Sequence, residues 1–340
     1  MIFVTGGTGL VGAHLLFELT KRGQQVRALK RNTSNLDQVL RTFSYYTKEP
    51  QPFFNSIEWV EGDIFDYFSL EELLRGIDEI YHCAAIVSFD EKERSHTIGN
   101  NVEGTSNLVN AALENGVKRI CHVSSIAALG KRENGEMVSE KTNWIPAKKH
   151  SAYSESKFYS EAEIWRGVEE GLDAVIVNPS IILGPGNWEN SSARFFKTIW
   201  DGMKFYTKGV TGYVDVNDVV SIIVQLMEEE NFERVKNERY LLNAENLSYE
   251  DIFNHIAVAL GKPQPSVYAS DFMMGMAWRL AKFASWFTGK KPLITREVAT
   301  GRNDINNFDG SKITGVLNFQ YTPISDSIQK TAKLFLEEAK

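Results

Sequence analysis

Residues 1–12 read Met-Ile-Phe-Val-Thr-Gly-Gly-Thr-Gly-Leu-Val-Gly, an apolar run that passes directly into spaced glycines. The amphipathic stretch Leu10–Lys21 follows, so the expected order is strand, glycine-rich turn and helix. Gly6 permits a tight turn, Gly9 lets a pyrophosphate approach the backbone, and Gly12 lets the helix pack closely on the strand. N–H groups at a helix start bind phosphate. The stretch predicts a dinucleotide-binding turn; the alternative is a strand-to-helix turn without a ligand.

Strands alternate with helices over the first half of the chain, which is typical of a parallel sheet with helices on both faces. After the first strand we expect strands at Gln25–Leu29, Ile57–Glu61, Glu79–Ala84, Arg119–Val123 and Ala174–Val177, and helices at His96–Glu114 and Tyr153–Glu169. Ser69-x-x-Glu72 and Ser248-x-x-Asp251 predict two further helix starts as capping boxes. The pattern predicts an α/β fold, a Rossmann-type doubly wound sheet whose ligands bind beyond the strands' C-terminal ends.

The regular alternation ends near residue 180. Asn187–Gly212 and Pro263–Asn307 read as irregular and aromatic-rich, with a strand-like run at Glu238–Asn243 and a last helix at Ser325–Glu338. We expect a dinucleotide-binding domain over residues 1–180, to which segments at about 210–245 return, and a smaller mixed α/β lobe formed mainly by residues 181–340 that binds substrate. The insertion Asn32–Asn55 follows the second strand, and its role is open.

Composition narrows the function classes. The chain has 340 residues, 43% hydrophobic and 24% charged, with a net charge of −7 and no basic block, so nucleic acid is not expected as a partner. Cys83 and Cys121 lie in apolar runs that read as buried strands, which predicts structural burial, no metal site and a reducing compartment. Because Met1 begins the first strand directly, we expect no signal peptide and a cytoplasmic location.

The segment Phe272–Phe287 is rich in aromatic residues and methionine, with Arg279 and Lys282 inside it and Lys290-Lys291 after it. It is shorter than the roughly 20 apolar residues of a membrane-spanning helix. We interpret it as a helix packed on the C-terminal lobe. A pocket lid, a homodimer contact or binding to a membrane surface stay as alternatives.

The segment Tyr153-Ser-Glu-Ser-Lys157 carries the catalytic signal, because residues four apart on a helix project from one face. A nearby ammonium group favours phenolate, so Lys157 is expected to lower the pKa of Tyr153 from about 10 towards neutrality. Tyr153 would then act as a proton donor and acceptor. Ser124-Ser125 stands at the end of the strand Arg119–Val123.

These features together resemble the extended branch of the short-chain dehydrogenase/reductase superfamily, the NAD-dependent epimerase/dehydratase family. The spacing Gly6-x-x-Gly9-x-x-Gly12 carries the resemblance, and further matching motifs begin at Asn101, Asn178 and Tyr213. The resemblance implies a Ser-Tyr-Lys triad of Ser125, Tyr153 and Lys157, with Ser124 as the alternative serine. It also implies that Asn101 supports an active-site water network. Asn178 departs from the family pattern, which usually has Arg before this proline.

The second strand indicates which dinucleotide is preferred. An acid about 20 residues after the glycines is typical of NAD sites, whereas an Arg accommodates the 2′-phosphate of NADP. The stretch Arg27–Leu36 holds no acid, and Lys30-Arg31 stands at the strand end. We therefore predict NADP(H), with NAD(H) as the second possibility. A solvated charge at Arg31 is the alternative interpretation.

The resemblance also implies the other cofactor contacts. Asp63 would accept from the adenine amino group while Ile64 packs on the ring, although Asp63 could equally cap the next turn. The small residues of His82-Cys83-Ala84-Ala85, at the end of the fourth strand, would let the cofactor lie against the backbone, although tight sheet packing would also explain them. Pro179 and Ile182 would border the nicotinamide. The cofactor-binding residues implied are Thr5, Gly6, Gly9, Leu10, Val11, Gly12, Lys30, Arg31, Asp63, Ile64, Ala84, Ala85, Tyr153, Lys157, Pro179 and Ile182.

The reaction class follows from what stands after Ser125. Dehydratases of the family carry an Asp-Glu pair there, whereas this chain has Ile126-Ala127, and the run Val26–Arg31 looks most like dihydroflavonol-4-reductase-like members, with hydroxysteroid-dehydrogenase-like members close by. We expect an NADP(H)-dependent oxidoreductase that reduces a ketone or aldehyde of a small, fairly apolar substrate. A nucleotide-sugar epimerase and a non-catalytic NADP-sensing protein are the alternatives. The candidate pocket residues are Val87, Phe89, Ile126, Leu129, Phe195, Phe196, Tyr206 and Tyr213.

Overall fold

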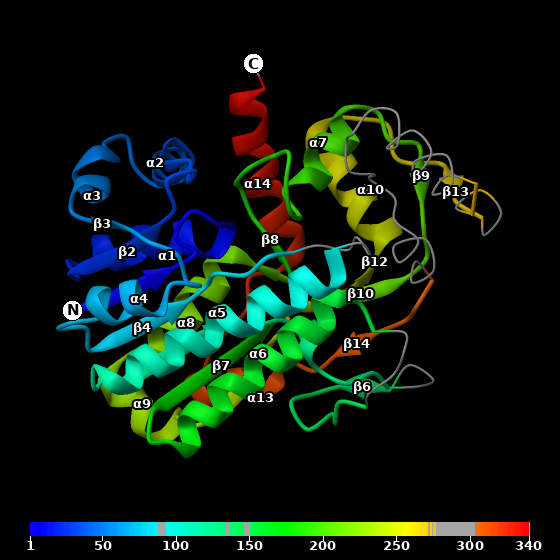
Figure 1. Cartoon of the computed structure of the whole chain (residues 1–340). Helices are drawn as coiled ribbons and strands as arrows, with labels where there is room; N and C mark the ends of the chain where they lie inside the picture. Colours follow the sequence, from blue (N-terminus) through cyan, green and yellow to red (C-terminus); the bar gives the residue numbers. More distant parts are fainter. Residues whose placement is uncertain are drawn as a thin grey trace.

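The computed structural model describes residues 1–87, 93–132, 136–145, 150–270, 273, 275–276 and 303–339. Its centre is a parallel sheet of seven strands in the order β11-β7-β5-β4-β1-β2-β3 (Figure 1). The strands are β1 Ile2–Thr5, β2 Val26–Lys30, β3 Glu58–Glu61, β4 Glu79–His82, β5 Arg119–Val123, β7 Asp173–Pro179 and β11 Glu238–Leu242. The order reverses between β1 and β4, which is where such sheets bind ligands. The predicted Rossmann-type fold class is confirmed.

Alternate strand residues face two separate apolar cores. Val4 and Val177 belong to the core under α1 (Leu10–Lys21) and α8 (Val216–Met227). Phe3 and Ile176, their neighbours in sequence, belong to the core on the opposite face. Because side chains alternate along a strand, two buried faces require the nearly continuous apolar strands of this sequence.

Three helices cover the second face: α4 Tyr67–Leu73, α5 Arg94–Glu114 and α6 Ala152–Glu169. The two long ones, α5 and α6, lie side by side across the sheet (Figure 1). This layer positions α6 against the C-terminal ends of β5 and β7, where the predicted serine and tyrosine meet.

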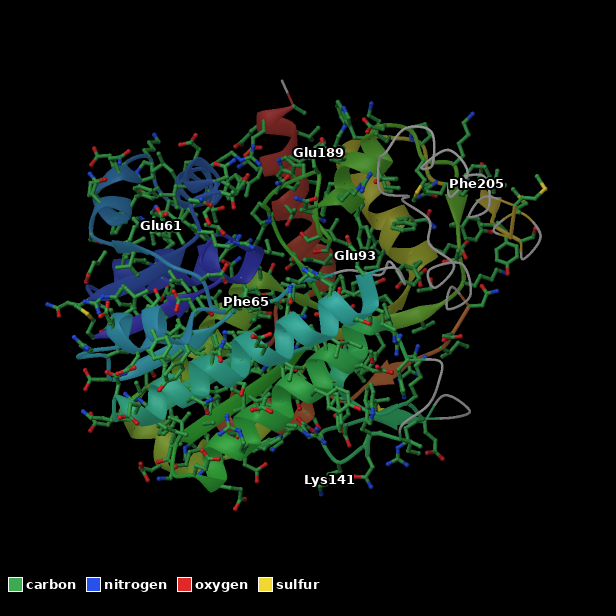
Figure 2. All side chains as sticks on the ribbon, viewed as in Figure 1. Glu61, Phe65, Glu93, Lys141, Glu189 and Phe205 are labelled. Atoms are coloured by element: carbon green, nitrogen blue, oxygen red, sulfur yellow. The ribbon has the colours of Figure 1, made fainter. Side chains whose placement is uncertain are left out.

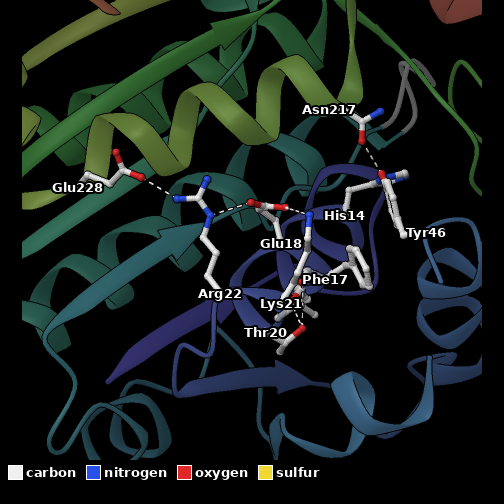
Figure 3. Close-up of polar contacts among 10 residues, drawn as sticks. His14, Phe17, Glu18, Thr20, Lys21, Arg22, Tyr46, Asn217 and Glu228 are labelled. Carbon is white, nitrogen blue, oxygen red and sulfur yellow. Dashed lines mark hydrogen bonds and ion pairs between the residues drawn. The ribbon is translucent and has the colours of Figure 1, made fainter. Parts of the chain in front are cut away.

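The insertion after β2 is ordered and packs on α1. It forms α2 (Leu36–Ser44) and α3 (Gln51–Asn55), and Phe17 of α1 stacks on Tyr46 with ring centroids 4.6 Å apart. The Tyr46 hydroxyl donates to Asn217 Oδ1 at 2.5 Å and is also bonded to His14 (Figure 3). The insertion thus ties α1 to the start of α8.

Among the described residues, three smaller sheets and several helices lie outside the main sheet. One sheet has three strands, β8 Ile181–Leu183, β10 Val210–Asp215 and β12 Glu245–Ser248. Two further sheets have two strands each: β6 Met137–Val138 pairs with β14 Asn307–Phe308, and β9 Phe205–Tyr206 pairs with β13 Val267–Tyr268. The helices are the 3₁₀ turn Ile126–Ala128, α7 Arg194–Trp200, α9 Glu229–Val235, α10 Tyr249–Leu260, α13 Ser311–Leu317 and α14 Ile324–Glu338. Figure 2 places Phe205 at the outer edge of this part, and its side chain is 48% exposed. The domain boundary at residue 180 stays a prediction.

Two local predictions are wrong. Helix α4 begins after Asp66, whose carboxylate accepts from the Ser69 N–H at 3.2 Å, so the cap stands three residues before the predicted Ser69 box. An aspartate upstream takes the N-cap role, and Ser69 becomes part of the first turn. Strand β4 ends at His82, so Cys83 lies beyond the strand and is only partly buried, whereas Cys121 is buried on β5. The predicted capping box of Ser248 and Asp251 is confirmed on α10.

The segment Asn187–Gly212 is more regular than expected, because it contains α7 and β9. Of the segment Phe272–Phe287, the structure describes Met273, Gly275 and Met276, and the rest lies outside the described residues. Within the described ranges, no helix is both long and apolar enough to cross a bilayer.

Candidate active site

The turn after β1 requires glycine at two positions. Gly6 has φ +69°, a left-handed conformation, and a Cβ there would lie 2.5 Å from the backbone nitrogen of Ala84. A Cβ at Gly12 would collide with the carbonyl oxygen of Gly6. Gly9, by contrast, is exposed at the N-cap of α1. Packing therefore demands the first and third glycines, whereas a Cβ on the exposed Gly9 would lie 3.3 Å from the Gly6 carbonyl oxygen.

The start of α1 fits a pyrophosphate group. No described side chain caps this helix end. The backbone N–H groups of Leu10, Val11 and Gly12 stand in the first turn, where a helix offers them no internal acceptor. Gly9 at this end is exposed, whereas Val11 and Gly12 are buried. The uncapped N–H groups fit the phosphates of a dinucleotide, and their binding stays a prediction.

A buried chain of hydrogen bonds connects this turn to α5. Thr105 Oγ1 donates to the Asn101 carbonyl at 2.7 Å, so it accepts from His82 Nε2–H at 3.1 Å. The other ring nitrogen, Nδ1, then accepts from Thr5 Oγ1–H at 2.7 Å. Burial, with the nearby Lys157 charge, lowers the pKa of His82 to about 3. His82 is therefore neutral at physiological pH, and it links Thr5 to Thr105 through hydrogen bonds.

Asn101 braces the loop that follows β4. Its Oδ1 accepts from the Ile86 N–H at 2.7 Å, while Nδ2 donates to the Ile86 carbonyl at 2.9 Å and to Ser156 Oγ at 3.0 Å. Asn101 is 6% exposed. The side chain thus joins α5, α6 and the loop that carries Ala84 and Ala85. Its role in a water network stays a prediction.

Ser125 meets Tyr153 at the end of β5. Ser125 starts the 3₁₀ turn, and its Oγ accepts from the Ala127 N–H at 3.1 Å. Its hydroxyl also forms a hydrogen bond with the Tyr153 phenol. Ser125 is half-buried, whereas Ser124 is buried. The exposure and the contact favour Ser125 over Ser124, as the sequence predicts.

Lys157 lies one helical turn after Tyr153 on α6 and is 4% exposed. Its ammonium group donates to the Val123 carbonyl of β5 at 2.9 Å. Burial lowers the pKa of Lys157 to about 8, and the negative charge of Glu161 opposes this change. The ammonium form thus predominates at neutral pH but is lost under mildly alkaline conditions.

The prediction that Lys157 lowers the pKa of Tyr153 towards neutrality is wrong. The pKa of Tyr153 is raised, because burial of the phenol disfavours its anion, and the hydrogen bond with Ser125 opposes this only in part. The ammonium group of Lys157 is directed at the Val123 carbonyl. Tyr153 is therefore a protonated phenol, ready to donate.

A polar cluster that sequence reasoning missed lies behind the triad. Asn178 of β7 is fully buried, and its Nδ2 donates to the Ser125 carbonyl at 3.0 Å and to Glu161 Oε1 at 2.5 Å. Arg239 of β11 approaches Glu161 Oε2 at 3.5 Å. A signal was available, because Tyr153, Lys157 and Glu161 recur every four residues and so share one helix face.

The basic residues Lys30, which ends β2, and Arg31, which follows it, differ in their partners. Lys30 forms an ion pair with Glu61 of the neighbouring strand β3 at 3.3 Å; Figure 2 labels Glu61. Arg31 is exposed; its backbone N–H donates to Ser34 Oγ, and no contact of its guanidinium group occurs with the residues that the structure describes. Of these two residues, Arg31 is therefore the one whose guanidinium group is available to bind the 2′-phosphate of NADP.

The remaining cofactor candidates lie around the same edge. Asp63 Oδ1 accepts from the Phe65 N–H at 3.2 Å, so it closes a turn, and its adenine contact stays a prediction. The Ile64 side chain packs closely on Gly104 of α5, since a Cβ on that glycine would collide with it. Pro179 ends β7, and Ile182 is half-buried on β8.

The prediction of a place in the substrate pocket is wrong for three residues. Phe196 and Tyr213 are fully buried in the lobe core and Leu129 is 3% exposed, so apolar packing uses all three. Phe89 lies outside the described residues. Exposed or half-buried surface remains on Val87, Ile126, Phe195 and Tyr206.

The comparisons with known proteins agree with this geometry. The model of the "NAD dependent epimerase/dehydratase family" matches residues 2–241. The chain belongs to this family. It is 32% identical over 270 residues to a putative dihydroflavonol 4-reductase of Synechocystis sp., covering 77% of this chain and 73% of the relative. It is 30% identical over 268 residues to sterol demethylase protein B of Methylococcus capsulatus, covering 77% and 75%.

A solved structure named gox2253 superposes with a TM-score of 0.80 and 28% sequence identity, covering 99% of this chain and 98% of that chain. As a member of the epimerase/dehydratase family, the chain is confirmed as an NAD(P)-dependent enzyme of the extended dehydrogenase/reductase branch. The family match ends at β11, so it includes the seven-stranded sheet and the Ser125, Tyr153 and Lys157 cluster.

Proposed function

We propose that the protein is an NADP(H)-dependent reductase of a ketone or aldehyde on a small, fairly apolar substrate. The observation that carries the proposal is the hydrogen bond between the Ser125 and Tyr153 hydroxyls at the C-terminal edge of the sheet, where the buried Lys157 donates to the end of β5. The relative named dihydroflavonol 4-reductase supports the choice of reduction.

Each residue of the triad has a separate task. When bound, NADPH supplies the hydride. Ser125 donates a hydrogen bond to the carbonyl oxygen and stabilises the charge that develops there. Tyr153 donates a proton to the same oxygen, a task that its raised pKa suits, because the phenol stays protonated until the acceptor becomes basic. Lys157 places a positive charge beside Tyr153 and would bind the nicotinamide ribose.

Cofactor selection is assigned to Arg31. A planar guanidinium group binds a phosphate through two hydrogen bonds, and that of Arg31 is exposed at the end of β2. The cradle at Leu10, Val11 and Gly12 would hold the pyrophosphate. NADP(H) is therefore the proposed cofactor.

The wall beside Ser125 favours reduction over sugar chemistry. Ile126 and Ala127 offer no carboxylate to act as the base of a dehydration. They also offer no partner to a sugar hydroxyl, and burying an unpaired hydroxyl costs about 1–3 kcal/mol. The lobe that carries Phe195 and Tyr206 would bind an apolar ring.

The test compares two substrate panels. Purified protein with NADPH is given aromatic and alicyclic ketones and aldehydes, and absorbance of NADPH is followed. A second set receives UDP-, GDP- and dTDP-hexoses, with products analysed by mass spectrometry and NMR. We expect stoichiometric NADPH oxidation in the first panel. Conversion of a nucleotide sugar without net cofactor change would show an epimerase instead, and NADPH binding without turnover would show a sensor.

The proton donor is tested with a matched pair on α6. Tyr153→Phe removes one oxygen, so folding and NADPH binding are expected to persist while turnover falls by about 10²–10⁴-fold, the usual contribution of a positioned acid. Tyr159→Phe, at a side chain that is 46% exposed on the same helix, is the control and should keep the parent rate. Near-parent turnover in Tyr153→Phe would contradict the mechanism.

A further inference from the structure

A buried carboxylate lies one helical turn beyond Lys157. Glu161 is 2% exposed on α6, and its spacing of four residues places it on the helix face of Lys157. Its negative charge raises the pKa of Lys157 against the larger lowering by burial. A charge this deeply buried is costly unless other groups compensate it. The partners of Glu161 therefore indicate what the carboxylate does.

Two strands supply those partners. One amide group, Nδ2 of Asn178, donates to Glu161 Oε1 at 2.5 Å and to the Ser125 carbonyl at 3.0 Å. Arg239 Nη1 lies 3.5 Å from Glu161 Oε2, and the same guanidinium group donates to the Glu140 carbonyl. Asn178 thus connects the Glu161 carboxylate to the strand end that carries Ser125. Arg239, on the edge strand β11, places a positive charge beside the same carboxylate.

The other groups that face Lys157 cannot replace this charge. From β4 and β5, His82 and His122 are buried, and burial lowers the pKa of both, so they are neutral. After β4, burial raises the pKa of the Cys83 thiol to about 12. On α6 itself, the pKa of Tyr153 is raised. Among these described neighbours, Glu161 is the group that Arg239 and Asn178 stabilise as an anion, although burial raises its pKa.

We propose that Glu161 is a positioning residue of the active site: its carboxylate is the counter-ion of Lys157 and, through Asn178, holds the strand end that carries Ser125. For its effect on turnover this inference rests on the proposed function. For its effect on Lys157 it rests on the shared face of α6 and on the charge of Glu161, not on any reaction, so the two can be tested separately.

The first measurement is a titration that needs no substrate. Lysine labelled with ¹³C at Cε is incorporated, and the Lys157 signal is identified as the one missing from Lys157→Met. In the parent protein we expect it to titrate near pH 8, where burial places the pKa of Lys157. In Glu161→Gln we expect it about 1 pH unit lower, the low end of what a close opposite charge produces. Glu161→Asp keeps the charge and should titrate closer to the parent.

Glu163→Gln is the matched control, because Glu163 lies on the same helix and pairs with Arg166 at 2.9 Å. It should leave the Lys157 titration unchanged. If Glu161→Gln does not fold, Glu161→Ala takes its place: it removes the same negative charge, so Lys157 again titrates lower. An unchanged Lys157 titration in a folded Glu161→Gln or Glu161→Ala protein would overturn the proposal.

The second measurement is the pH profile of kcat/KM. In Glu161→Gln its alkaline limb should move down with the Lys157 titration, lowering kcat/KM up to about tenfold above pH 8 per unit moved. A profile that stays in place while the Lys157 titration moves would overturn the link to the active site. A parent protein that turns over no carbonyl would refute the proposed function and leave the titration result standing.

Discussion

Replacing Lys157 by Met should change how stability depends on pH. In the folded protein burial lowers the pKa of Lys157 from its ordinary 10.5 to about 8. Between these values the unfolded chain binds the proton and the folded chain does not, so this group makes the protein more stable as pH rises. Below pH 8 both states carry the charge, and the folded state bears the full cost of burying it.

The magnitude follows from the two pKa values. They differ by about 2.5, and each unit corresponds to about 1.4 kcal/mol, which places the cost near 3 kcal/mol. Lys157 is 4% exposed, so solvent screening reduces this value little. Met has a similar length and no charge. The variant loses the hydrogen bond to the Val123 carbonyl, but that loss is the same at every pH.

The assay is urea unfolding of the parent and Lys157→Met below pH 8 and again at pH 10.5. Across this pH range, we expect the free energy of unfolding of the parent to rise by about 3 kcal/mol more than that of the variant. Other titrating groups are common to both proteins and cancel in the comparison. A stability difference that stays constant from neutral pH to pH 10.5 would refute the argument that the Lys157 ammonium group is buried at a cost in the folded protein.

Three further predictions concern the turn, the cofactor and a helix start. Arg31→Ala should weaken NADPH binding by roughly 1.5–3 kcal/mol, the range for a charged hydrogen bond, with NADH nearly unchanged in the same fluorescence titration; equal losses would exclude Arg31 as the selector. Gly12→Ala places a methyl group against the Gly6 carbonyl, so binding of both dinucleotides should fall together, as calorimetry would show. Asp66→Ala should lower the free energy of unfolding by about 0.5–2 kcal/mol and Ser69→Ala by less, because Asp66 is the N-cap of α4; equal effects in urea unfolding would contradict this assignment.

Local signals predicted much of the fold. The strand before Gly6 and the helix after Gly12 occur where expected, because glycine spacing and apolar periodicity act within a few residues. The strand at Arg119–Val123 was predicted with its observed bounds. The cap of α4 was misplaced, since Asp66 and Ser69 both suit an N-cap and tertiary packing chose between them.

The sequence alone determined the order of strands and helices, the glycine turn and the face of α6 shared by Tyr153 and Lys157, because each depends on spacing along one element. Only the tertiary structure decided how those groups behave. The raised pKa of Tyr153 comes from burial, and the brace formed by Asn101 and the link from Asn178 to Glu161 join residues far apart in the chain. Burial and long-range hydrogen bonds exist only once the sheet and α6 have come together.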